Sequence, residues 1–167
     1  LRQHGVEKPH KLLLLLALAR MYERNPQRSR LIPIDDTLTA TFSEVIKEFS
    51  PSTPGESILI EYPFYHLTSD GLWSLIIREG KKSTFDKYVN SPNMRLTLSR
   101  LEETVQGGQL EVSIDQCLRD RNGNARVKAF LSKRLLELNE NIDKRSESQV
   151  HKERAQYSLF AHEAAAL

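Results

Sequence analysis

A chain of 167 residues is long enough for one domain with a hydrophobic core, and a composition of 39% apolar and 28% charged residues excludes a disordered protein. The longest apolar run, residues 12–19, is too short to cross a bilayer, so we expect no membrane partner. The single cysteine, Cys117, excludes an internal disulfide and cysteine-based zinc motifs, and it suits a cytoplasmic location.

The net charge of +2 conceals an uneven distribution of charged side chains. Residues 1–30 and 71–100 are basic, whereas residues 31–70 between them are acidic. If the fold brings the two basic blocks together, they form an anion-binding face. Otherwise they are ordinary solvated surface.

The first third of the chain predicts helix, short strand, helix. Residues 8–25 have apolar side chains at helical spacing, with Pro9 at the first helical position. An extended piece follows, in which Pro33 indicates the edge of a sheet. Residues 36–49 predict a second helix, capped by Asp36 or Thr37, and the polar stretch after it predicts a loop over residues 50–57.

The middle of the chain indicates a β-hairpin. Two apolar runs, residues 58–67 and 72–80, are separated by four turn-forming residues that end in Gly71, which is free to take a positive φ. The basic stretch over residues 81–94 has no clear pattern. Residues 95–108 then resemble a strand followed by a helix that two glycines close.

Two further helices are expected over residues 110–120 and 124–139, with Asn124 as the cap of the second. The polar stretch after them predicts a linker or a helical tail. This order of elements predicts an α+β fold that is mostly helical, with a small hairpin or sheet and winged-helix character.

No pattern in the sequence supports catalysis. The five histidines form neither a zinc-protease pair nor an HNH-type cluster, so we expect no metal site. Cys117 lies on an apolar helix stripe, as a small core residue would. No glycine-rich phosphate loop precedes a helix.

Two features indicate binding. His10 and Lys11 fall in the first turn of a helix, where cations are disfavoured unless an anion such as a phosphate is bound; alternatively, both side chains point to water. Tyr62, Phe64 and Tyr65 crowd one turn with Pro63 and Trp73. In one interpretation, Tyr62 and Pro63 form a shallow apolar surface. In the other, the whole group is a crowded hairpin core packed with Leu67.

These two motifs together resemble the sulfur-binding domain of type IV, phosphorothioate-dependent restriction endonucleases. The resemblance runs from about His4 to Asn139 and rests on PHKLLLLLALARM followed by YPFYHLTSDGLWSL. It implies that residues 1–140 bind double-stranded DNA in which sulfur replaces a non-bridging backbone oxygen. It also implies that residues 141–167 lead, as a helical tail or linker, towards an HNH nuclease domain carried elsewhere in the full-length protein. Whether the full-length protein forms a homodimer stays open.

The resemblance also implies roles for individual residues. The sulfur cavity consists of Tyr62, Pro63 and the backbone and Cβ region of His66. The phosphate is held by His10 and Lys11 and by an arginine, with Arg100 as the first choice and Arg95 as the second. No cofactor is implied, and the fragment itself is expected to bind rather than cut DNA.

Two other interpretations remain open at the level of sequence. One is a generic winged-helix module that reads bases, and the other is a protein-interaction module in which the aromatic turn is core. Comparing plain with sulfur-modified duplexes separates all three.

Overall fold

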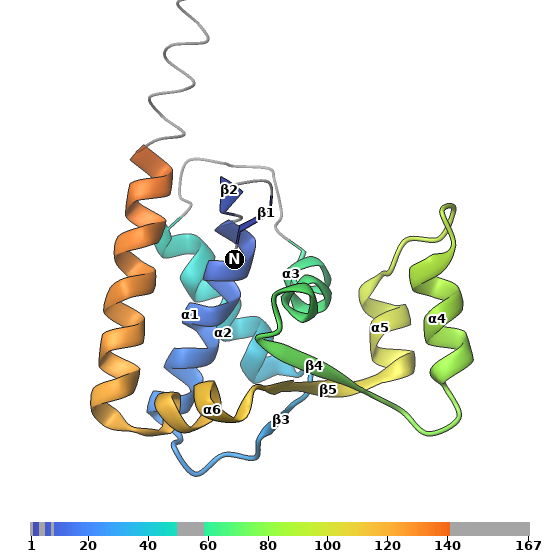
Figure 1. Ribbon diagram of the computed structural model, residues 1–167, viewed down its shortest axis with the longest axis horizontal. Coiled ribbons are helices and arrows are strands. Elements are labelled where there is room, and N and C mark those ends of the chain that lie inside the picture. The colour runs from blue at the N-terminus through green and yellow to red at the C-terminus, as the bar shows by residue number, and fades with distance from the viewer. Residues whose placement is uncertain (1, 4–5, 8, 50–58, 141–167) are drawn as a thin grey trace, which may run out of the picture.

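The computed structural model describes residues 2–3, 6–7, 9–49 and 59–140 of the protein (Figure 1). The predicted loop over residues 50–57 and the predicted tail from residue 141 lie outside them. The elements in chain order are β1 (Arg2–Gln3), β2 (Val6–Glu7), α1 (Pro9–Arg24), β3 (Leu31–Ile32), α2 (Asp36–Phe49), α3 (Glu61–His66), the 3-10 helix η1 (Leu67–Asp70), β4 (Trp73–Ile77), α4 (Lys82–Asn90), α5 (Leu98–Thr104), β5 (Val105–Leu110), α6 (Val112–Arg119) and a helix over residues 121–140.

Helix α1 is the centre of the core. It begins at Pro9, as predicted, and its side chains from Lys11 to Ala19 are all buried. A helix that is apolar all round must be covered on every side. Helices α2, α3 and α6 pack against α1, and the amide of Asn124, in the helix over residues 121–140, donates to the Ala19 carbonyl at 2.8 Å.

The three-stranded antiparallel sheet has the order β3-β5-β4, so the strand before Pro33 lies at an edge, as predicted. The two glycines of the 95–108 segment belong to the central strand β5 and do not close a helix, which corrects the sequence-based expectation. They are needed for close packing. A Cβ on Gly107 would lie 2.5 Å from the Ile32 carbonyl oxygen, and one on Gly108 would lie 2.6 Å from the Trp73 ring.

The predicted hairpin is wrong, because its first half is helical. Residues 61–66 form α3, η1 continues it, and β4 pairs with β5 instead. Pro63 is tolerated in the first turn of a helix, where its missing N–H has no partner to lose, but it would interrupt a central strand. Gly71 does take a positive φ, of 69°, but as the C-cap of η1.

Two predicted caps are also replaced by neighbouring side chains. Helix α2 is capped by Asp35, whose carboxylate accepts from the Leu38 N–H at 2.9 Å. Asp120 accepts from the Gly123 N–H at 2.8 Å and so caps the last helix. Asn124 is buried one turn inside that helix, and Cys117 is half-buried.

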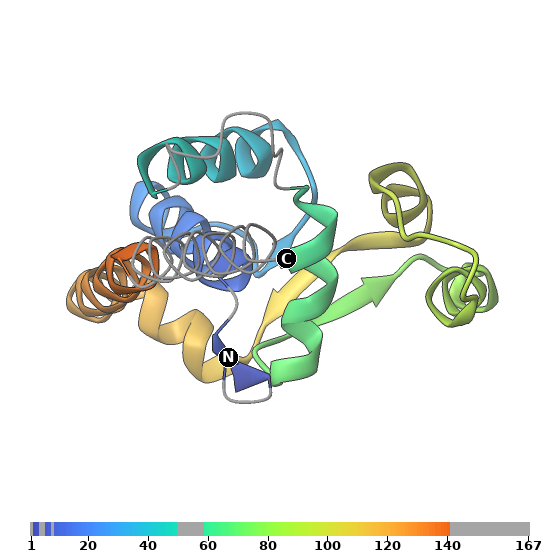
Figure 2. The ribbon, with the colours of Figure 1, turned by 90° about the horizontal axis from the view of Figure 1, so that it is seen from above.

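Helices α4 and α5 form an arm that projects from the rest of the molecule. The chain leaves the sheet at the end of β4, makes the two helices and returns as β5, and Figure 2 shows the pair standing apart from α1 and α2 with α3 between them. The fold is therefore α+β and mostly helical, as predicted. Its order of helix, strand, helix, helix and two paired strands is that of a winged helix with a helical arm in place of the wing.

Candidate nucleic-acid interface

The surface of α3 and the start of α1 meet at a cluster of aromatic rings. Tyr62 and His66 are one helical turn apart, and their ring centroids lie 4.3 Å apart. The ring of His10 lies edge-on to Tyr62 at 5.8 Å. The fold therefore brings together three residues that are 56 positions or fewer apart in sequence and that were expected at one site.

A rigid interior holds this surface in place. Phe64 and Leu67 on the inner side of α3 and η1 are fully buried, and Phe64 packs edge-to-face against Trp73 with ring centroids 4.5 Å apart. The Trp73 indole N–H donates to the Phe64 carbonyl at 3.0 Å. Pro63 is buried in the same turn, whereas Tyr62 is 45% exposed. Tyr62 is therefore the accessible apolar side chain of the cluster.

Lys11 points into the protein. The whole residue is only 5% exposed. Its ammonium group donates to the Asp70 carboxylate at 2.5 Å and to the Ser69 hydroxyl at 3.2 Å. This buried ion pair ties the start of α1 to η1, directly after the helix that carries Tyr62. The structure thus favours a positioning role for Lys11, and the hypothesis that it contacts a phosphate stays a prediction.

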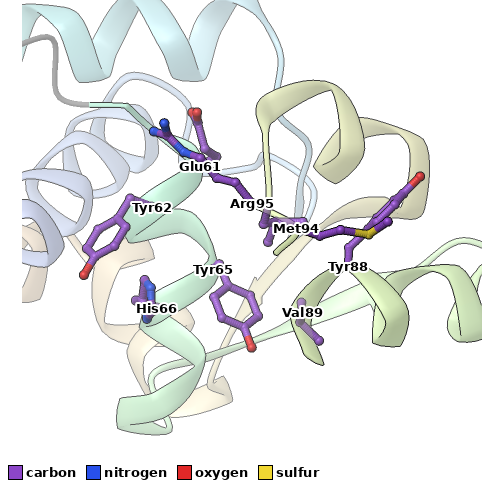
Figure 3. Close-up of a pocket in the computed structure, with 9 residues that line it drawn as sticks. Glu61, Tyr62, Tyr65, His66, Tyr88, Val89, Met94 and Arg95 are labelled. Carbon is purple, nitrogen blue, oxygen red and sulfur yellow. The ribbon is translucent and has the colours of Figure 1, made fainter. Parts of the chain in front are cut away.

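A cleft of about 500 Å³ separates α3 from the arm (Figure 3). Its α3 wall carries Tyr62, Tyr65 and His66, and its opposite wall comes from α4 and from the loop between α4 and α5. The lining on the arm side consists of Tyr88, Val89, Met94, Arg95 and Leu96. Most of this lining is apolar or aromatic, which is the surface that sugar rings, base faces and soft atoms tolerate.

The two candidate arginines have different surroundings. Arg95 lines the cleft, whereas Arg100 does not. The Arg100 guanidinium donates to the Arg95 carbonyl at 2.6 Å and lies 5.2 Å from the centre of the Tyr88 ring. The geometry therefore favours Arg95, the second choice, as the arginine that faces a ligand.

A family model for the ScoMcrA-like DNA sulfur-binding domain matches residues 1–141. The chain belongs to this family. The resemblance on which the sequence-based expectation rested is confirmed, and the protein is a DNA-binding domain. No curated protein matches the chain.

In this sulfur-binding domain the basic blocks do not simply merge into one face. Arg20 pairs with Glu48, Arg24 with Glu44 at 2.9 Å, and Lys11 with Asp70, so three of the seven basic side chains of the first block pair with the acidic block that follows it. The second block lies mostly on the arm and on the loop between its helices. Two side chains of this second block, Lys81 and Lys82, also pair with acidic residues, at 3.8 Å and 2.9 Å, so both blocks are partly neutralised by their neighbours.

Several residues of the cleft were not singled out from the sequence as site residues. Both Glu61 and Tyr65 lie on α3. Helical spacing would have placed Tyr65 one turn after Glu61 and Tyr62, whereas strand alternation separates Tyr62 from Tyr65. Tyr88 and Met94 had no signal, because nothing local indicates that the arm turns back towards α3.

Neither a metal site nor a membrane span emerges from the part of the chain that the structure describes. There, no three histidine, cysteine or acidic side chains gather as metal ligands, and no helix is both long and apolar enough to cross a bilayer.

Proposed function

We propose that this DNA-binding domain recognises a phosphorothioate in the DNA backbone and takes up the sulfur beside Tyr62, Pro63 and His66. The observation that carries the proposal is the contact between the exposed Tyr62 ring and His10 in the first turn of α1. An apolar surface and a helix N-terminus, which attracts anions, therefore lie side by side. A phosphate with one soft, poorly hydrated atom needs both.

The discrimination follows from hydration. An ordinary phosphate oxygen placed against Tyr62 and His66 loses strong hydration without gaining a matching hydrogen bond, which costs roughly 1–3 kcal/mol. Sulfur is larger, more polarisable and less strongly hydrated, so its transfer to the same surface is favourable or nearly neutral. The difference corresponds to about tenfold to a hundredfold preference for modified DNA.

The remaining residues of the proposed site have supporting roles. The ion pair between Lys11 and Asp70 fixes α1 against η1 and so sets the spacing between His10 and Tyr62. Arg95 brings a positive charge to the DNA from the opposite wall of the cleft. Arg100 acts through the Arg95 carbonyl. In this proposal His10 and Arg95 contact the DNA directly, and Lys11 and Arg100 position them.

The family also supports a role in restriction. We propose that the domain directs a type IV restriction nuclease of the HNH type, carried elsewhere in the full-length protein, to sulfur-modified DNA. The support is the family membership of residues 1–141.

The test compares one short duplex with and without sulfur at a single linkage of defined stereochemistry. Tyr62→Ala and Pro63→Ala should weaken binding to the modified duplex about tenfold or more and leave the weak binding to the plain duplex nearly unchanged, as measured by gel shift. Equal losses on both duplexes would mean that this surface does not recognise sulfur.

Phe130 provides a matched control. It is an aromatic residue that is 60% exposed, on the helix over residues 121–140 and outside the lining of the cleft. Phe130→Ala should leave both affinities unchanged. If the wild-type protein bound plain and modified duplexes equally, the generic base-reading module would be the better account.

A further inference from the structure

A second cleft lies at the end of α1 that is far from the proposed sulfur surface. Its volume is about 510 Å³, and it is bounded by the end of α1, the end of α6 and the start of the helix over residues 121–140 (Figure 1). Its lining includes Tyr22 on α1 and Arg119 on α6. Because His10 and Tyr22 are 12 residues apart on α1, the second cleft lies about 18 Å along the helix from the cluster around Tyr62.

A network around Arg119 gives the second cleft a fixed shape, and it uses all three nitrogens of the guanidinium. The guanidinium donates to the Asp115 carboxylate at 2.9 and 3.0 Å, and to the carbonyls of Pro26 and Arg28 at 2.9 and 2.8 Å. The Tyr22 hydroxyl donates to Asp115 at 2.5 Å. The network ties α1, the turn after it and α6 together, so the walls are positioned before a ligand arrives.

Asn124 gives the second cleft a buried acceptor. The residue lines the cleft and is 2% exposed, and its amide nitrogen donates to the Ala19 and Leu118 carbonyls, both at 2.8 Å. Because carbonyls only accept, these bonds fix which end of the amide is the nitrogen, and they use both of its hydrogens. The amide oxygen is buried and has no hydrogen-bond partner in the part of the chain that the structure describes. A buried acceptor without a donor is unfavourable, so a ligand that brings an N–H group to Asn124 is favoured.

One cation in the lining of the second cleft is left for an anion. Lys128 pairs with Glu23, and both side chains line the cleft. Arg121, at the start of the helix over residues 121–140, is exposed and forms neither a hydrogen bond nor an ion pair with any residue that the structure describes. The neighbouring Asp120 carboxylate is occupied by the Gly123 N–H. A positive side chain at a helix N-terminus is unfavourable by itself, and a bound anion offsets this.

We propose that the second cleft binds a nucleotide, with its phosphate on Arg121 and the amino group of its base on Asn124. A volume of about 510 Å³ is typical of a small-molecule site. A guanidinium binds a phosphate through two parallel N–H groups, and adenine, cytosine and guanine each carry an amino donor. Leu118 and Ala125 in the same lining give the face of the base an apolar surface. A free nucleotide and the phosphorylated end of a single strand present the same groups.

Calorimetric titration of the whole chain with adenosine, cytidine and guanosine monophosphate tests the proposal. At least one of them should bind with one-to-one stoichiometry, and about tenfold or more tightly than inorganic phosphate or its own nucleoside. Asn124 is tested through the ligand, because its amide also holds α1 against α6. Dimethylation of the amino group of the base removes the N–H donors and should weaken binding about fivefold or more. A single-stranded trinucleotide with a 5′-phosphate that binds more tightly than the mononucleotide would assign the same site to strand ends.

Variants of the helix over residues 121–140 separate the second cleft from general charge. Arg121→Met should weaken nucleotide binding about tenfold. Ala125→Phe, which fills the cleft from an exposed position, should abolish it. Arg126→Met and Ala129→Phe are the matched controls, because both residues are exposed on the same helix and neither lines the second cleft. All four variants should keep the wild-type affinity for plain and sulfur-modified duplexes, which also shows that they are folded.

Three results would overturn the nucleotide site. They are no binding of any of the three nucleotides at millimolar concentration, binding that Ala125→Phe leaves unchanged, and equally tight binding of a hexaglutamate peptide, which would indicate an acidic protein partner. The preference of the wild-type protein for sulfur-modified DNA is a separate readout. Its absence would contradict the proposed function and leave the nucleotide site unaffected.

Discussion

Lys11 illustrates how one residue can satisfy a sequence motif and yet do a different task. Its place in the first turn of α1 indicated a phosphate contact, but its ammonium group is bonded to Asp70 and Ser69 inside the protein. The side chains of Lys11 and Asp70 are only 6% and 13% exposed. Such a pair contributes little net stability compared with apolar packing, but removing one member takes a charge-assisted hydrogen bond away from the charge that stays.

We therefore expect Lys11→Met to destabilise the domain by roughly 1–3 kcal/mol, because the largely buried Asp70 carboxylate loses a charge-assisted hydrogen bond. Urea denaturation measures the change. The salt dependence of DNA binding, measured under conditions in which the variant is folded, should stay the same, because the ammonium group is bonded to Asp70 and Ser69 inside the protein. If the slope of the logarithm of the binding constant against the logarithm of the salt concentration became shallower by about one, Lys11 would instead be a phosphate contact.

The double variant Lys11→Met with Asp70→Asn is the control for this effect. It removes both charges and should recover most of the lost stability. A double variant as unstable as the single one would show that Lys11 stabilises the fold through its alkyl chain rather than through the ion pair.

At the level of elements, long amphipathic helices were predictable and the short elements around the site were not. Helix α2 has the bounds read from its stripe of apolar side chains, and α1 begins at the expected proline. The six residues of α3 are too few for helical spacing to be told from alternation, and their aromatic side chains favour a strand. Tertiary packing of Phe64 on Trp73 and the proline in the first turn decide the outcome.

The site itself was predictable only as far as its motifs reach. His10, Tyr62 and His66 do come together, because both motifs lie on elements that pack directly against each other. The choice between Arg95 and Arg100 depends on the path of the arm, which the local sequence does not encode. The glycines at 107 and 108 look like a helix end, and only the approach of Ile32 and Trp73 explains them.

That close approach makes a prediction for strand β5. Gly108→Ala should destabilise the domain by about 1–3 kcal/mol, because the added Cβ would lie 2.6 Å from the Trp73 ring, which is buried and cannot move freely. Thermal unfolding followed by circular dichroism measures the change. Gln106→Ala, at an exposed position of the same strand, is the control and should change stability little. If the Gly108→Ala variant were as stable as the wild-type protein, the Trp73 ring and its contact with Phe64 would have to shift at low cost.

For the whole molecule, the division into a packed body and a projecting arm determines how the charges are used. In the body, three basic side chains of the first 30 residues, Lys11, Arg20 and Arg24, pair with acidic ones, so part of that block is neutralised within the body. The arm, which projects from the body (Figure 1), carries much of the second basic block. We therefore expect the body to supply the proposed sulfur surface, and the arm, through Arg95, to add salt-dependent affinity.

Removing the arm tests this division directly. The Arg78 N–H donates to the Thr104 carbonyl at 2.8 Å, so the two ends of the arm are already neighbours and a two-residue Asn-Gly turn can replace residues 79–103. We expect the shortened chain to unfold cooperatively, with a loss of roughly 1–3 kcal/mol, because Tyr65 loses its ring contact with Phe85 of the arm. It should keep its preference for sulfur-modified over plain duplexes, and bind both more weakly with a shallower salt dependence. Circular dichroism and gel shifts at two salt concentrations measure these effects. A folded chain that no longer prefers sulfur would place the arm in the sulfur site, because α3 and α1 alone would then be insufficient to hold the modified phosphate.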